Sequence, residues 1–240
     1  MSKPRKSYAL WITGHCLKGL FALLIFAVCA LLVWRVFISG NPPKEMKRLA
    51  VNDKLTAAYA AHGEGLELYT QEQATVTRGE HNYGYFGIPR FVIVPQAGQV
   101  QVTFRYNNST LEAIQKDLSL PEEPPRGVEI FDVSLVTVCD MTPEDKSDNA
   151  DGSATLAQSR IAPTSRVIDT TMLYTYILYT FDGVDITPET VAVFFDVYYG
   201  TQPDYTAAPM GTLRLYHCES ANLPVDLSAK EEKALKKGGY

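Results

Sequence analysis

The sequence has few of the residues that build metal and redox sites. Its 240 residues include four cysteines and four histidines. No Cys-x-x-Cys pair occurs and no two histidines lie four residues apart, so zinc and dithiol redox sites lack support. A Gly-x-Ser-x-Gly elbow and a glycine-rich phosphate loop are also missing. We therefore predict no cofactor, no metal and no catalytic residue, and a binding protein fits the sequence better than an enzyme.

Positive charge is scarce beyond the N-terminal region. Residues 1–48 hold eight basic residues and one acid, whereas residues 49–240 hold 14 basic and 26 acidic residues, which gives net charges of +7 and −12. A domain of charge −12 repels a phosphate backbone, so nucleic-acid binding is disfavoured. The acidity indicates a solvated surface or, alternatively, a surface for cations or basic partners.

Charge is absent from Gly19 to Trp34, and this run predicts a transmembrane helix over residues 19–38. Twenty residues at about 1.5 Å each cover about 30 Å, the thickness of the hydrocarbon core. Arg35 lies near one end, from which its side chain reaches the headgroups. The alternative is a cleavable signal peptide, but no small-x-small cleavage site follows the run. The lipid bilayer is thus the first predicted partner.

The chain divides into five predicted regions. We expect a basic cytoplasmic tail (1–18), the transmembrane helix (19–38), a helical juxtamembrane stalk (39–63), a β-sandwich outside the cytoplasm (64–225) and an exposed C-terminal helix (226–240). A short basic tail ahead of a large acidic domain favours a cytoplasmic N-terminus in a single-pass protein of the cell membrane.

Short β-rich runs with turn residues between them predict an antiparallel β-sandwich. Phe91–Val94 and Gln99–Tyr106 flank a turn and read as a hairpin, and the second run alternates apolar and polar residues as a half-buried strand does. Met172–Phe181 is apolar on both faces, so we expect other elements to cover it. Further strands are predicted at Leu66–Thr70, Ala74–Thr77, Val128–Cys139, Ser165–Thr170, Thr190–Tyr199 and Gly211–Cys218, with residues 141–163 as a long loop.

Two capping-box sequences, Ser109–Glu112 and Ser228–Glu231, predict short helices. Between them, Cys139 and Cys218 each end a predicted strand. Outside the cytoplasm these two cysteines would form a disulfide, and the alternative is a pair of buried free thiols.

The acidic segment 144–152 resembles a calcium loop, with Asn149 and Asp151 as the candidate ligands. Gln158 stands where such a loop carries its bidentate glutamate, so a solvated loop is the favoured interpretation.

Tyrosine is abundant, with 14 residues. Tyr83, Tyr85, Tyr174 and Tyr176 form a candidate binding surface for a protein or glycan partner, because a phenol supplies both ring area and a hydrogen bond. Ordinary packing within the sheets is the alternative.

Together these features predict a membrane-anchored extracytoplasmic β-sandwich with a binding or assembly role at the cell envelope or surface. One alternative is an envelope hydrolase or carbohydrate-active domain that uses Asp and Glu. Another is an accessory subunit that contacts a larger membrane complex through its transmembrane helix.

Overall fold

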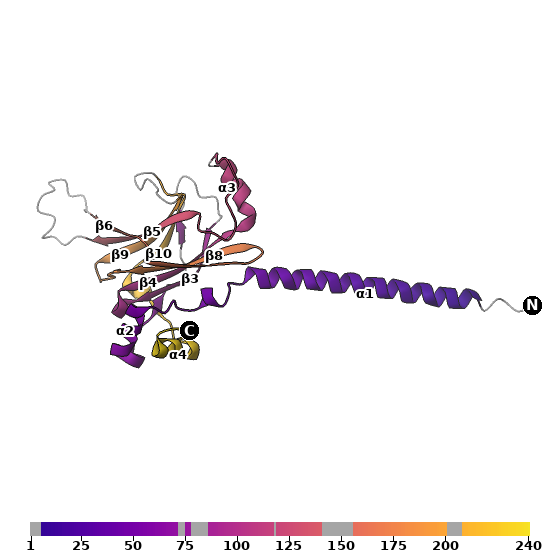
Figure 1. Cartoon of the computed structure of the whole chain (residues 1–240), viewed down its shortest axis with the longest axis horizontal. Coiled ribbons are helices and arrows are strands. Elements are labelled where there is room, and N and C mark those ends of the chain that lie inside the picture. Colours follow the sequence, from indigo (N-terminus) through magenta and orange to yellow (C-terminus); the bar gives the residue numbers. More distant parts are fainter. Residues whose placement is uncertain (1–5, 72–74, 78–85, 118, 141–155, 201–207) are drawn as a thin grey trace, which may run out of the picture. The chain divides into compact units, whose positions relative to one another are not determined.

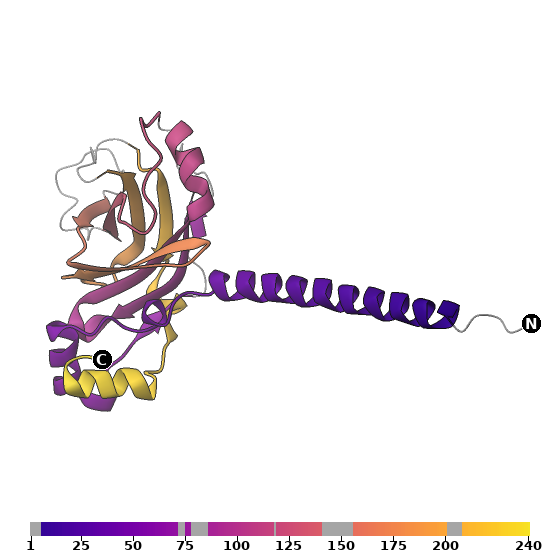
Figure 2. The same cartoon turned by 45° about the vertical axis from the view of Figure 1, so that its right-hand side comes forward.

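The structure is a computed structural model that describes residues 6–71, 75–77, 86–117, 119–140, 156–200 and 208–240. The chain forms two compact units, residues 1–41 and residues 42–240. Among the described residues, the first unit contains one helix, and the second contains two β-sheets with three helices and several 3₁₀ turns (Figures 1 and 2).

The helix of the first unit is α1 (Lys6–Gly40), 35 residues long. Within it the stretch His15–Arg35 is long and apolar enough to cross a membrane. Its large apolar side chains from Leu17 to Trp34 are 48–74% exposed in the structure. By length and composition, this stretch of α1 is a candidate membrane span, and it covers most of the predicted segment 19–38, all of which lies within α1.

The second unit is mainly β, with two antiparallel sheets that agree with the predicted β-sandwich (Figure 2). The first sheet has the order β11-β1-β3-β4-β8-β7 and the second the order β2-β10-β9-β5-β6. The first sheet consists of β1 (Tyr69–Thr70), β3 (Phe86–Val94), β4 (Gln99–Asn107), β7 (Ser165–Thr170), β8 (Tyr174–Asp182) and β11 (Leu223–Pro224). The second consists of β2 (Thr75–Thr77), β5 (Phe131–Asp140), β6 (Leu156–Ile161), β9 (Thr190–Tyr199) and β10 (Gly211–Tyr216).

Aromatic rings fill the space between the sheets. The ring of Phe104 lies 5.5 Å from that of Phe195 and 6.0 Å from that of Phe131, the latter edge-on. Val100, Val102, Phe104 and Tyr106 of β4 are all fully buried on this inner face, as the sequence alternation predicts. Burial of a large apolar side chain contributes about 1.5–3 kcal/mol, so this layer is the main source of stability.

The outer face of the first sheet is covered as well. The 3₁₀ turn η1 (Glu45–Lys47), helix α2 (Asp53–His62) and helix α4 (Ala229–Lys237) pack over it, with Met46, Leu49, Leu55 and Leu235 at most 1% exposed. Both views show α2 and α4 beside one another (Figures 1 and 2). The expectations of a separate stalk at 39–63 and of an exposed C-terminal helix are therefore corrected, because the apolar side chains of both segments complete this layer.

The polar face of β4 is sealed by the same layer. Gln101 accepts from the amide of Ala50 (2.8 Å) and donates to the Ala50 carbonyl (2.8 Å). Thr103 Oγ1 donates to the Met46 carbonyl over 2.9 Å. Gln101 and Thr103 are thus at most 2% exposed, and the expectation of a half-buried strand is wrong for this face. The covering of β8, in contrast, was expected from its apolar pattern and is confirmed.

Turns and caps follow the local sequence. The β3–β4 hairpin closes through the 3₁₀ turn η3 (Pro95–Ala97) and Gly98, whose φ of 54° suits a residue without Cβ. Helix α3 (Leu111–Asp117) follows the turn η4 (Asn108–Thr110), and the predicted capping box of Ser228 and Glu231 starts α4. β6 lies inside the segment expected to be a loop, and β11 was not expected. The remaining 3₁₀ turns are η2 (Gly63–Gly65) and η5 (Glu219–Ala221).

Candidate functional site

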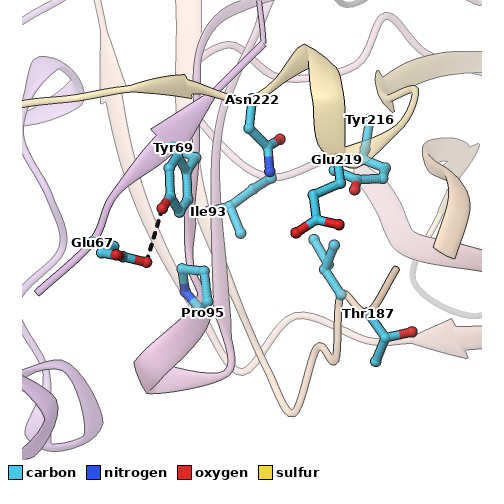
Figure 3. Close-up of a pocket in the computed structure, with 9 residues that line it drawn as sticks. Glu67, Tyr69, Ile93, Pro95, Thr187, Tyr216, Glu219 and Asn222 are labelled. Carbon is cyan, nitrogen blue, oxygen red and sulfur yellow. Dashed lines mark hydrogen bonds between the residues drawn. The ribbon is translucent and has the colours of Figure 1, made fainter. Parts of the chain in front are cut away.

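A pocket of about 380 Å³ opens at one end of the β-sandwich (Figure 3). Its walls come from the start of β1, the β3–η3 junction, the β8–β9 loop and the turn after β10. The volume lies in the range of about 300–1,000 Å³ typical of small-molecule sites. The lining residues are Glu67, Tyr69, Ile93, Pro95, Ile186, Thr187, Tyr216, Glu219 and Asn222. Two carboxylates and no cationic side chain stand among them, so the pocket disfavours anions.

Tyr216 reaches this pocket because β10 bulges. The pairing of β10 with β9 shifts register between Arg214 and Tyr216, so Leu215 and Tyr216 both join the core although they are neighbours in a strand. Tyr216 is 1% exposed, and its hydroxyl has no hydrogen-bond partner within the described part of the chain. Figure 3 shows this hydroxyl on the side of the ring toward Glu219. Burial, together with the charge of Glu219, raises the pKa of Tyr216 to about 12, so the phenol is a proton donor at neutral pH.

The opposite wall carries a tyrosine–carboxylate pair. The Tyr69 hydroxyl donates to Glu67 Oε2 over 2.8 Å (Figure 3). This hydrogen bond, then burial and the negative charges of Glu67 and Glu219, raise the pKa of Tyr69. Since Tyr69 donates its hydroxyl proton to Glu67, its hydroxyl oxygen remains able to accept a hydrogen bond from a ligand. The two walls therefore offer a ligand both donors and acceptors.

Gln71 holds the turn that carries Glu219 and Asn222. Its Nε2 donates to the Cys218 carbonyl and to Asn222 Oδ1, both over 2.9 Å, and its Oε1 accepts from the His217 amide over 2.8 Å. With Oδ1 engaged by Gln71, the Asn222 amide group offers its Nδ2 donors to the pocket. One side chain thus fixes both the turn and the orientation of a lining amide.

Tyr176 was predicted to lie on a binding surface, and the structure corrects this prediction. That residue is fully buried beneath Met46, in a cluster that Tyr174 flanks with its ring 6.0 Å away. The guanidinium of Arg105 stacks over the Tyr174 ring at 4.6 Å. The covering layer explains this correction, since it occupies the face on which both rings stand. Tyr83 and Tyr85 lie outside the described residues.

Cys139 and Cys218 are free thiols and half-buried. Cys139 Sγ lies 3.6 Å from Thr190 Oγ1, and Cys218 Sγ lies 3.0 Å from Ser220 Oγ. Cys139 belongs to β5, Cys218 lies in the turn after β10, and no bond joins the two sulfurs. The disulfide alternative is therefore not realised. The calcium-loop candidates Asn149 and Asp151 lie outside the described residues, and no group of three metal-binding side chains occurs within them.

A second polar cluster lies on the outer face of the second sheet. Arg160 donates to Ser134 Oγ (3.1 Å) and to the Tyr198 hydroxyl (2.6 Å), and it lies 3.6 Å from Asp196. Burial raises the pKa of Asp196, while Thr212 and Arg160 oppose that effect. These groups are hydrogen-bonded or ion-paired with one another, which is the pattern of a structural network.

Comparison of the chain with protein-family models, with curated proteins and with solved structures finds no match in any of the three. The functional interpretation of the pocket therefore depends on its geometry alone. Sequence reasoning missed all of its residues as a site, and the only local signal was the polar and aromatic content of the runs Glu67–Gln71 and Tyr216–Asn222.

Proposed function

We propose that this chain is a membrane-anchored binding protein whose β-sandwich takes a neutral polyhydroxylated ligand, such as a glycan, into the end pocket. The observation that carries the proposal is the polar lining of the pocket, where the carboxylates of Glu67 and Glu219 stand with Tyr216, whose buried hydroxyl has no hydrogen-bond partner among the described residues. A buried hydroxyl without a hydrogen bond costs about 1–3 kcal/mol, and a ligand acceptor would recover that cost.

The charge and polarity of the lining select among ligand classes. The carboxylates of Glu67 and Glu219 accept hydrogen bonds from ligand hydroxyls, while Tyr216 and Asn222 donate to them. A sugar presents donors and acceptors together, and its apolar C–H face suits the ring of Tyr69 beside Ile93. A simple cation would match the carboxylates but leave the Tyr216 proton unused, and an anion would be repelled.

A binding experiment with the full chain in detergent tests the ligand class. An array of neutral oligosaccharides is compared with a lysine-rich peptide and a polyphosphate, and affinity for the best oligosaccharide is then measured by calorimetry. Tyr216→Phe should weaken binding about tenfold, since one hydrogen bond to a buried group is lost. Tyr174→Phe, a tyrosine outside the pocket, is the matched control and should leave the affinity unchanged.

Two outcomes would count against the ligand class. One is binding to the lysine-rich peptide alone, which would make the pocket a cation site. The other is an oligosaccharide affinity that Tyr216→Phe and Glu219→Gln both leave intact, which would place the glycan elsewhere on the surface.

The proposed topology is a cytoplasmic N-terminus with the β-sandwich on the outer side. It rests on the candidate span of α1 and on the basic tail before it. Protease added to intact cells should remove a C-terminal epitope tag while leaving an N-terminal tag protected. The reverse protection pattern would place the domain in the cytoplasm.

A second candidate function is hydrolysis of a glycosidic bond. The presence of two carboxylates from separate elements, Glu67 and Glu219, in one pocket favours it, because such enzymes use a pair of acidic residues. New reducing ends released from the bound oligosaccharide would show turnover, and Glu219→Gln should then abolish release while binding persists. A ligand recovered intact supports binding alone.

A further inference from the structure

Basic side chains gather at a second pocket, on the covering layer of the first sheet. This pocket has a volume of about 260 Å³ and lies between α4 and the segment that follows η1. Its lining residues are Arg48, Lys230, Lys233, Ala234, Lys237, Gly239 and Tyr240. Four of these seven carry a positive charge and none has an acidic side chain, in a domain whose net charge from residue 49 onward is −12.

The helix sequence explains why three lysines converge. Lys230, Lys233 and Lys237 have the i, i+3, i+7 spacing that places side chains on one face of a helix. The acids of α4 are engaged elsewhere: Glu231 is buried, and Glu232 pairs with Lys236. No carboxylate of the described residues forms an ion pair with any of the four cations that line the pocket.

Both ends of the domain build this pocket. Gly238 has a φ of 74° and ends α4, after which the Gly239 amide donates to the Ala234 carbonyl over 2.9 Å. The returning chain places the Tyr240 ring 5.2 Å from the Arg48 guanidinium, and the Tyr240 hydroxyl donates to the Leu49 carbonyl over 3.1 Å. Arg48 and α4 are therefore held together by specific contacts, although like charges repel.

The short connection between α1 and Arg48 indicates the class of ligand. Only residues 41–47 separate the last residue of α1 from Arg48, a length of at most about 28 Å when fully extended. Tyr240 is 63% exposed, and tyrosine is a residue typical of the membrane–water interface. We propose that the pocket of Arg48, Lys230, Lys233 and Lys237 binds the phosphate group of anionic phospholipids and so docks the domain on the membrane that α1 crosses. Lysine and arginine near an anionic leaflet are attracted in this way.

Lysine labelling of the full chain in nanodiscs tests this docking. The chain is reconstituted with phosphatidylcholine alone or with added phosphatidylglycerol, treated with an amine-acetylating reagent and read by mass spectrometry. Labelling of Lys230, Lys233 and Lys237 should fall about fivefold in the anionic discs, as expected for lysines attracted to an anionic surface. Lys116 of α3, which pairs with Glu112, is the internal control and should label equally in both discs.

Arg48→Gln with Lys236→Gln as its matched control tests the pocket itself. Arg48→Gln should lessen the protection of Lys233 in anionic discs, whereas Lys236→Gln should not, because Glu232 already holds that lysine. Unchanged labelling in the phosphatidylcholine discs confirms that each variant is folded.

Inorganic phosphate added to phosphatidylcholine discs separates the two sources of phosphate. Protection by the anionic lipid but not by inorganic phosphate supports membrane docking. Equal protection by inorganic phosphate would assign the pocket to a soluble phosphate compound and overturn the lipid assignment. Equal labelling under all conditions would overturn phosphate binding altogether.

Discussion

Gln71 Nε2 donates to Asn222 Oδ1 over 2.9 Å, although the two residues are 151 positions apart in the chain. The same nitrogen donates to the Cys218 carbonyl, and the Gln71 oxygen accepts from the His217 amide. Gln71 thus ties the end of β1 to the turn after β10, and both segments line the pocket. The geometry of the candidate site depends on this one side chain.

Gln71→Ala should therefore weaken ligand binding more than it weakens folding. The turn at residues 217–222 loses three hydrogen bonds at a partly exposed site, for an expected cost of about 1–2 kcal/mol of stability. The affinity for the array oligosaccharide should fall about tenfold or more, since Asn222 is no longer oriented. Hydrogen exchange of the His217 amide should accelerate. Gln115→Ala in α3 is the control, and equal effects of the two substitutions would contradict a positioning role for Gln71.

Tyr216→Phe should separate stability from binding. Removal of a buried hydroxyl that has no partner should leave the free energy of unfolding unchanged or raise it by up to about 1–2 kcal/mol, whereas ligand affinity falls. Urea unfolding of the full chain in detergent, followed by circular dichroism, measures the first quantity. A clear loss of stability would mean that the hydroxyl already has a partner in the ligand-free protein.

The titration of Tyr216 adds a pH signature. Its folded pKa of about 12 lies above the value of about 10 for an unfolded tyrosine. The folded state therefore holds this proton more tightly, so its contribution to stability is complete below pH ~10 and is lost as the pH rises through about 12. The phenolate absorbance of wild-type protein minus that of Tyr216→Phe should show one group with a midpoint near pH 12. A midpoint at the unfolded value would contradict the burial of the hydroxyl.

The sequence predicted best which faces of a strand are buried, because the pattern of apolar and polar residues along one strand is enough to show this. The alternation from Val100 to Tyr106 predicted the inner face of β4, and the two apolar faces of Met172–Phe181 predicted that something covers β8. What covers the first sheet was not predictable, because Met46, which packs on β8, and Leu235, which packs against β3, come from opposite ends of the chain and bear no local signal of these contacts.

The pocket could not be predicted from the sequence for a related physical reason. A period-two pattern with Leu213 and Leu215 inside places Tyr216 outside, and only the bulge, which arises from the pairing with β9, reverses this direction. Similarly, Glu67 and Glu219 line one pocket because Gln71 holds the turn that carries Glu219. A single sequence shows the residue types but not the long-range pairing that collects them.

Gln101 should be the most sensitive polar residue of the covered sheet. It makes two hydrogen bonds with the backbone of Ala50 in a buried setting and also donates to Gln99 Oε1 over 2.7 Å. Gln101→Ala leaves the Ala50 amide and carbonyl without partners, at an expected cost of about 2–4 kcal/mol. Gln158→Ala, on the exposed strand β6, should change stability by less than about 0.5 kcal/mol. Urea unfolding of both variants checks the contrast, and similar values would argue against the sealing of β4.

Glu231 and its neighbour Glu232 offer the sharpest test of how α4 is attached. Glu231 accepts from the Leu49 amide (3.0 Å), from Ser228 and from Arg90 (3.3 Å), and it is 6% exposed. Its burial favours a higher pKa, but the hydrogen bonds from Ser228 and Leu49 and the charge of Arg90 outweigh it, and the net pKa is lowered. The stabilisation is therefore present above the unfolded pKa of about 4.3 and is lost as the pH falls through the lower folded value.

Glu231→Ala should accordingly cost about 3 kcal/mol, because it leaves the half-buried Arg90 without its partner and releases the Leu49 amide. Glu232→Ala should leave the stability nearly unchanged, since Glu232 makes only an exposed i, i+4 pair with Lys236 and a long hydrogen bond with the Tyr59 hydroxyl (3.3 Å). Hydrogen exchange across residues 229–237 at neutral pH should rise only for Glu231→Ala, and acidification of the wild-type chain should produce the same local opening. If both variants left α4 equally protected, apolar packing around Leu235 rather than the carboxylate would hold the helix in place.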